Sequence, residues 1–240
     1  TLLLIDADGT TITDLFSWSA LDTDISMGRL PDGARDWSYF EHPTPGSANT
    51  TPEVLKGRTR APRVTKEPGT YDGPITVVLE ADPGAQVRYT LDGRTPARDR
   101  GEPYMAPIHI EGHTVVRAIA VAAGELPSRE FCGTYVIGGA HDAVCLVLDP
   151  EDLEGGNGIN VHGDHANHTR SGPAWERPAH VSFPGVGGAM LPVGARISGS
   201  GSRGLAKRSF KLVARDRYDS PKGGSPFGNA RFREGVLRAD

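Results

Sequence analysis

Hydrophobic and polar residues alternate over short stretches in the middle of the chain. The stretches GPITVVLEA (73–81) and AQVRYTLDG (85–93) both follow this pattern, and it continues through 104–112, 113–124 and 129–138. Alternation with a period of two is typical of strands that bury one face, and Gly, Pro or charged turns bound each stretch. Six to seven such strands predict a β-sandwich over residues 61–138. The residues expected to point into its core are Val77, Leu79, Val87, Tyr89, Leu91, Ile108, Val116, Ala118 and Tyr135. Asp92-Gly93 predicts a tight hairpin turn, because such turns need positive backbone angles.

The first 50 residues contain fewer strands. TTITDLFSW (10–18) alternates, with Ile12, Leu15 or Phe16, and Trp18 as candidate inward residues. Two short strands are expected on either side of the Pro31-Asp32-Gly33 turn. Such a segment has too few strands to close a sandwich by itself. Residues 51–60, which continue a stretch rich in Pro, Ser, Thr and Asn, predict a linker.

Residues 139–240 begin with a strand, CLVLD, and a short helical turn that Asp149 or Pro150 starts. Further along, GARISGSGSRGLAKRSFKLVAR predicts two paired antiparallel strands, 193–198 and 207–214, with a glycine loop from Gly199 to Gly204 between them. The period of two places Phe210 and Leu212 on the inward face and Lys207 and Lys211 on the other. The predicted fold class is therefore mainly β, with sandwich modules followed by the β-rich start of an α+β segment.

Composition supports this fold class and narrows the chemistry. Of 240 residues, 31 are Gly and 19 are Pro, which favours short strands and many turns. No apolar window is long enough to predict a membrane span. The net charge is −4, but residues 201–240 carry ten bases against four acids. A basic end can attract phosphate or acidic polymers, or it can be the solvated rim of a sheet. Cys132 and Cys145 both lie in apolar strand-like runs, which predicts buried free thiols and no disulfide.

The glycine loop has the spacing Gly-x-Gly-x-x-Gly, which is common around phosphates. A phosphate loop of the Walker type or of the dinucleotide-binding type requires a helix after the last glycine, and a strand follows here. Strand, glycine loop, strand with emerging lysines is instead the arrangement that covers a nucleotide's phosphates in kinases. The candidate nucleotide-binding residues are Gly199, Gly201, Arg203, Gly204, Lys207 and Lys211. An ordinary hairpin turn is the alternative.

Other candidate sites are weaker. His162, Asp164, His165 and His168 could ligate zinc, but nothing local fixes their placement, so an exposed loop is expected. Trp18, Trp37 and Trp175 could stack on sugars or simply pack. Glu80 and Asp92 lie on a small sandwich with little room for a glycosidase pocket. We therefore predict no catalytic residue and no metal ligand in this chain.

Three segments resemble known families. Residues 1–50, with GRLPDGARDW and PTPGSAN, resemble the C-terminal strands of a lamin-tail domain. Residues 61–138 are similar to the C-terminal module of chitobiases, which is fibronectin type III-like, through YTLDGRTP, YMAPIHI and TVVRAIAVAAGELPS. Residues 139–240 resemble the opening of the spore-coat (CotH-type) kinase family through GIN, WERPAHVSF and GARISGSGSRGLAKRSFKLVAR.

These resemblances imply a piece of a larger bacterial protein that is secreted or attached to the cell surface. The parent would be a protein kinase that uses ATP and Mg²⁺ and carries accessory sandwich modules. Because the metal-binding aspartates of that family lie further downstream, the present chain is expected to be inactive and to need no cofactor. An acceptor protein or a cell-surface polysaccharide is the expected partner, and nucleic acid is not. The alternative is a non-catalytic carbohydrate-binding or adhesive array, and spacer modules are a third possibility.

Overall fold

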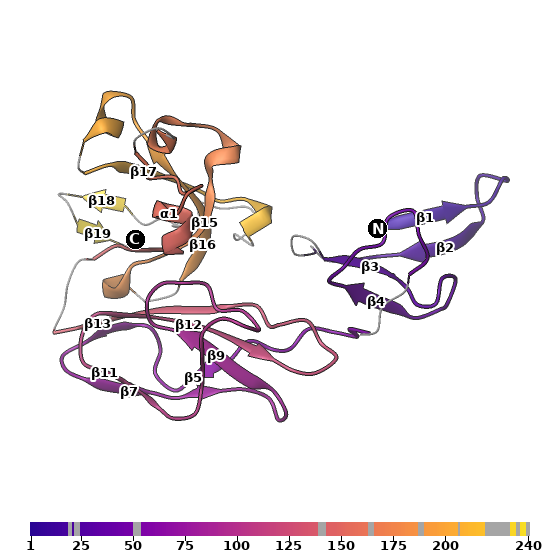
Figure 1. Ribbon diagram of the computed structural model, residues 1–240, viewed down its shortest axis with the longest axis horizontal. Helices are drawn as coiled ribbons and strands as arrows, with labels where there is room; N and C mark the ends of the chain where they lie inside the picture. Colours follow the sequence, from indigo (N-terminus) through magenta and orange to yellow (C-terminus); the bar gives the residue numbers. More distant parts are fainter. Residues whose placement is uncertain are drawn as a thin grey trace. The chain divides into compact units, whose positions relative to one another are not determined.

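The computed structural model describes residues 1–18, 21, 25–49, 54–138, 143–162, 166–186, 190–205, 207–218, 231–233 and 236–238. The fold is mainly β, as predicted, and the chain divides into two compact units (Figure 1). One unit contains Thr1–Gly57 with Gly124–Leu126, and the other contains Arg58–Ala123 with Pro127–Asp240. None of the helices in the described ranges has the length and hydrophobicity to span a bilayer.

The first unit consists of two antiparallel hairpins. Strand β1 (Leu2–Ile5) pairs with β2 (Ile12–Phe16), and β3 (Ser26–Arg29) pairs with β4 (Trp37–Phe40) around the predicted Pro-Asp-Gly turn. Phe16 stacks on Trp37 with ring centroids 3.5 Å apart. Of the residues predicted to point inward, Ile12, Leu15 and Trp18 are exposed, whereas Phe16, the alternative to Leu15, is half-buried. A two-stranded hairpin buries little of its own surface, which explains the three exposed side chains.

The second unit begins with the β-sandwich. Its strands are β5 (Arg63–Val64), β6 (Gly69–Tyr71), β7 (Ile75–Val77), β8 (Leu79–Glu80), β9 (Gln86–Thr90), β10 (Glu102–Pro103), β11 (Ile108–Ile110), β12 (Thr114–Val121) and β13 (Phe131–Ile137). Strands β10, β9, β12, β13 and β6 form one sheet in that order. Two strand pairs, β11 with β7 and β5 with β8, supply side chains to the opposite side of the core. The strands predicted over 85–91 and 114–121 are thus confirmed as strands.

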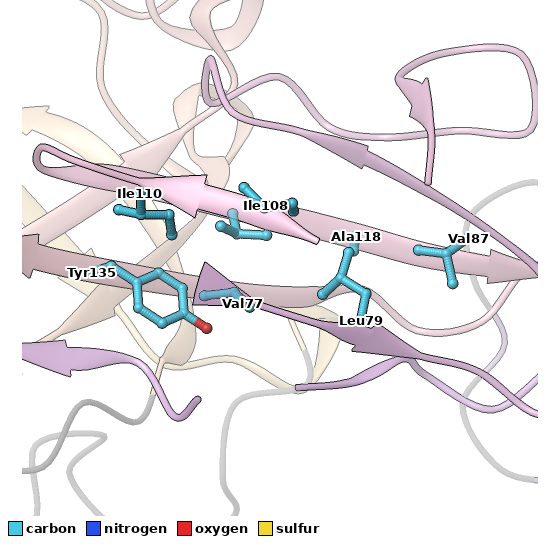
Figure 2. Close-up of a cluster of buried hydrophobic side chains, with 8 residues drawn as sticks. Val77, Leu79, Val87, Ile108, Ile110, Ala118 and Tyr135 are labelled. Atoms are coloured by element: carbon cyan, nitrogen blue, oxygen red, sulfur yellow. The ribbon is translucent and has the colours of Figure 1, made fainter. Parts of the chain in front are cut away.

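The core between these layers contains most of the side chains that the alternation predicts. Figure 2 shows it as a cluster of buried residues, namely Val77, Leu79, Val87, Ile108, Ile110, Val116, Ala118 and Tyr135. Burying a side chain of this size stabilises a fold by roughly 1.5–3 kcal/mol. The Tyr135 hydroxyl donates a hydrogen bond of 2.8 Å to the carbonyl of Lys66, so its one polar atom has a partner in the core.

Two predictions at the end of β9 need correction. Tyr89 is only half-buried, and Leu91 is 44% exposed. Strand β9 ends at Thr90, so Leu91 lies beyond the pleat and no longer follows its alternation. The tight hairpin at Asp92-Gly93 is also wrong. Gly93 does have a positive φ of 83°, but the next strand begins only at Glu102.

The remaining segment forms a four-stranded antiparallel sheet. It contains β14 (Cys145–Leu148), β15 (Arg177–Ser182), β16 (Leu191–Ser198) and β17 (Ser209–Val213), in the order β14-β15-β16-β17. Helix α1 (Pro150–Glu154) follows β14, and Asp149 caps it by accepting a hydrogen bond from the Glu151 amide, as expected. A hairpin of β18 (Arg231–Arg233) and β19 (Val236–Arg238) lies near the C-terminus. Short 3₁₀ turns, η2 (Asn167–Thr169), η3 (Pro173–Trp175), η4 (Pro184–Val186), η5 (Gly201–Gly204) and η6 (Asp216–Tyr218), connect these elements.

The two faces of this sheet differ in chemistry. One face carries a buried cluster of Ala179, Val181, Phe183, Val193 and Ala195, against which Leu212 packs. The register places His180, Arg196 and Lys211 on the opposite face, and Glu176 immediately precedes β15. The prediction that Phe210 packs inward is wrong, since Phe210 is 38% exposed. Among the described residues β17 is one of the two edge strands of this sheet, so Phe210 has a neighbouring strand on one side only.

Candidate functional site

The glycine loop joins two paired strands, as the sequence predicts. Ser198 at the end of β16 lies opposite Ser209 at the start of β17, and Ile197 lies opposite Phe210. The loop leaves β16 at Gly199 and continues through η5. Strand β17 begins at Ser209, two residues later than predicted, so Lys207 lies in the loop and only Lys211 lies on the strand.

The three glycines of the motif have different roles. Gly199 has a φ of 101°, and a β-carbon there would lie 2.0 Å from the Ser202 hydroxyl. The turn itself therefore requires glycine at 199. Among the described residues no atom beyond the chain neighbours lies within 4 Å of a β-carbon added at Gly201 or Gly204, and neither glycine has a positive φ. The fold gives no steric reason for glycine at these two positions, whereas close approach of a ligand to the backbone would give one.

Arg203 shapes the loop from within. Its guanidinium donates hydrogen bonds to the carbonyls of Gly199, at 2.5 Å, and of Arg170, at 2.6 Å, with a longer one to His168. These bonds fasten the loop to η2. Arg208 adds a second connection by donating to the Arg203 carbonyl at 2.9 Å and contacting the His162 ring. Sequence reasoning expected Arg203 to face phosphate, and the structure shows most of its donors already engaged with the protein backbone.

Lys207 and Lys211 are the exposed cations beside the loop. Lys211 lies opposite Arg196 across the β16–β17 register. Arg196, unlike Lys211, is half-buried and ion-paired, with a guanidinium nitrogen 3.9 Å from the carboxylate of Glu176. Of the six predicted residues, Gly199, Gly201, Arg203, Gly204 and Lys207 share one loop, and Lys211 projects from the adjoining strand.

Glu176 organises a charged cluster that the sequence did not reveal. Its carboxylate is fully buried and accepts hydrogen bonds from Arg215 at 2.8 and 3.1 Å and from Arg217 at 2.8 Å. The hydrogen bonds from Arg215 are the largest of the effects that lower the pKa of this carboxyl below its usual 4.5. Tyr218 covers Gly194, where a β-carbon would lie 2.3 Å from its ring. With Arg196, three cations surround one anion, so the face next to Lys211 keeps an excess of positive charge.

The histidine-rich stretch is only partly described. His162 is exposed and His168 is half-buried, and their rings stack with centroids 4.1 Å apart. Asp164 and His165 lie outside the described residues. The expectation of an exposed loop without a metal site stays a prediction. Among the tryptophans, Arg170 and Arg177 lie over the ring of Trp175, and Arg29 lies over Trp37, while Trp18 is exposed.

The second unit thus combines a small β-sandwich with a sheet that presents a glycine loop and lysines. Comparison with known families identifies part of it. Residues 66–131 match the family model of the chitobiase/beta-hexosaminidase C-terminal domain, which agrees with the resemblance seen in the sequence. Searches of curated proteins and of solved structures found no match. Both cysteines are free, as expected, with Cys132 buried and Cys145 half-buried.

Proposed function

We propose that the chain is part of a secreted or cell-surface bacterial protein whose parent transfers a phosphoryl group from ATP to an acceptor protein. The glycine loop would hold the phosphates of ATP. The observation that carries this proposal is the open space at Gly201 and Gly204 beside the exposed Lys207 and Lys211. Backbone amides at glycine positions can approach an anion closely, and lysines add charge-assisted hydrogen bonds.

The residues of this chain would bind and orient the substrate without reacting with it. Lys211, extended from a strand, would contact the phosphates from a fixed backbone position. Lys207 and the amides of the loop would contact them from the other side. Arg203 would keep the loop in shape through the carbonyls of Gly199 and Arg170. Mg²⁺ ligands and an acid–base group would come from outside the stretches that resemble the kinase family. The chain by itself is therefore expected to bind ATP weakly and to catalyse nothing.

Substitution of Lys211 tests the proposal. In the parent protein, Lys211→Ala should lower ATP binding and phosphoryl transfer at least tenfold and leave the melting temperature nearly unchanged, because the side chain is exposed. Lys66→Ala is the matched control, since Lys66 is also an exposed lysine but lies in the sandwich. If Lys211→Ala unfolds the domain and spares ATP binding, Lys211 is structural and the loop does not bind phosphate.

The second candidate function is binding of a carbohydrate. It is favoured by the family match over residues 66–131, a module that takes its name from carbohydrate-active enzymes. A non-catalytic array would bind polysaccharide through this module and would show no change on addition of ATP. Binding of the chain to immobilised chitin and other surface polysaccharides, measured with and without ATP, separates the two functions. Binding to neither ligand would favour a spacer.

A further inference from the structure

Three potential metal ligands meet where the sandwich contacts the four-stranded sheet. Within the described residues, Glu130, Cys132 and His180 bring one ligating atom each to within 4.8 Å of one another. Glu130 immediately precedes β13, Cys132 lies on it, and His180 comes from β15. Because Glu130 and Cys132 are two residues apart, they lie on the same face of β13, away from the sandwich core that Phe131 and Tyr135 line.

One potential ligand atom of this cluster has no hydrogen-bond partner. His180 Nδ1 is buried and has no hydrogen-bond partner among the described residues. A buried polar atom without a partner costs roughly 1–3 kcal/mol, so such atoms are uncommon. Cys132 is 7% exposed and unpaired, although its thiolate form would make it a strong metal ligand.

Glu130 is already held in position. Arg117 donates to both oxygens of its carboxylate, with one bond of 2.9 Å and a shorter one, and a third donor of the same guanidinium bonds to the Gly93 carbonyl. A carboxylate has about four acceptor positions, so two remain for other partners. Metal-binding carboxylates are commonly hydrogen-bonded in this way, and such bonds fix the ligand's orientation.

We propose that Glu130, Cys132 and His180 bind a divalent transition metal of the zinc class. A thiolate, an imidazole and a carboxylate are the ligands that zinc takes, and the thiolate disfavours Mg²⁺ and Ca²⁺. Donor atoms around a tetrahedral zinc lie roughly 3.3–3.8 Å apart, so each pair of ligand atoms would approach by about 1.5 Å at most. Water would complete the coordination. This site does not depend on the proposed phosphate loop. The spacing of cysteines and histidines in the sequence did not predict it.

The consequence of binding would be mechanical. The metal would join β13 of the sandwich to β15 of the next sheet through three side chains. Metal binding would then stabilise the second unit as a whole, because a ligand that binds only the folded state shifts unfolding by mass action.

Cobalt(II) is a suitable spectroscopic probe. The whole chain, stripped of metal with a chelator, should bind one Co²⁺ and develop a thiolate-to-cobalt charge-transfer band together with the visible bands of a tetrahedral ion. Zn²⁺ should displace the cobalt and raise the melting temperature. Cys132→Ser should abolish the charge-transfer band, and His180→Ala should weaken binding at least about 100-fold, a loss beyond the range for outer-shell partners.

Cys145→Ser is the matched control, because it removes the other thiol and leaves the three ligands in place. Its spectrum and affinity should equal those of the unchanged chain. The proposal is overturned if the unchanged chain shows no thiolate band with Co²⁺, or if Cys145→Ser removes the band. Either result is independent of whether the Cys132 or His180 variants fold.

Discussion

Alanine substitution at the three loop glycines separates a structural turn from a phosphate loop. At Gly199 the φ of 101° is unfavourable for alanine, and the added methyl group would displace the Ser202 side chain. Strain of this kind costs about 1–3 kcal/mol, which lowers the melting temperature by roughly 2–4 °C per kcal/mol in a domain of this size. The β-carbon of Gly201→Ala meets no atom of the described part of the chain, and the variant should be more stable by about 0.4–1 kcal/mol, because alanine restricts the unfolded state.

The assays are thermal unfolding of this chain and ATP binding in the parent. If the loop holds phosphate, Gly201→Ala and Gly204→Ala should weaken ATP binding at least about tenfold, since one charge-assisted hydrogen bond contributes about 1.5–3 kcal/mol. Their unfolding temperatures should stay equal to or above that of the unchanged protein. Equal destabilisation by Gly199→Ala and Gly201→Ala would refute the steric argument. Stable variants with unchanged ATP affinity would refute the phosphate loop.

Four further substitutions test the rest of the fold. Leu79→Ala should cost about 2–5 kcal/mol in denaturant unfolding, while Leu91→Ala should cost less than about 0.5 kcal/mol, because only the first residue is buried. Asp149→Ala should cost about 1–3 kcal/mol, since the carboxylate accepts hydrogen bonds from the amides of Glu151 and Thr95. Glu176→Gln should remove the pH dependence that this carboxylate gives to the stability of the fold. The folded-state pKa of Glu176 is lowered from 4.5, so its stabilisation is present above that value and is lost as pH falls through the folded pKa. The difference in stability between the unchanged chain and Glu176→Gln should therefore shrink as the pH falls below 4.5, and a constant difference would contradict the assignment.

Alternation of hydrophobic residues predicted burial well along the long central strand of the sandwich. Strands β12 and β16 lie inside their sheets, and the residues expected to be buried on β12, Val116 and Ala118, are buried. The prediction was wrong where the sheet or strand ends. Leu91 lies one residue past β9, and Phe210 lies at the start of an edge strand. The pattern records which face a residue occupies, but it carries no information on where a neighbouring strand stops.

The candidate sites show the same limit. The glycine loop is contiguous in the sequence, so its hairpin could be predicted from residues 193–214. The Glu176 cluster and the Glu130, Cys132 and His180 cluster could not, because each joins segments that are distant in the sequence. Only the pairing of strands and the packing of sheets bring such residues together. A single sequence gives no signal for this, beyond the presence of polar residues in apolar strands.

Residues 91–101 connect β9 to β10, and their contacts explain why a tight hairpin does not form after β9. Its residues contact the segment that follows the sandwich. The Thr95 amide donates to Asp149 at 2.8 Å, and a β-carbon on Gly93 would lie 3.6 Å from the Leu148 carbonyl. Arg117 on β12 donates a hydrogen bond to the Gly93 carbonyl. The same Asp149 carboxylate caps α1, so one side chain fixes both the start of that helix and its place on the sandwich. A two-residue turn at Asp92-Gly93 would remove the Thr95 amide from this position. The longer connection therefore serves to attach β14 and α1 to the sandwich.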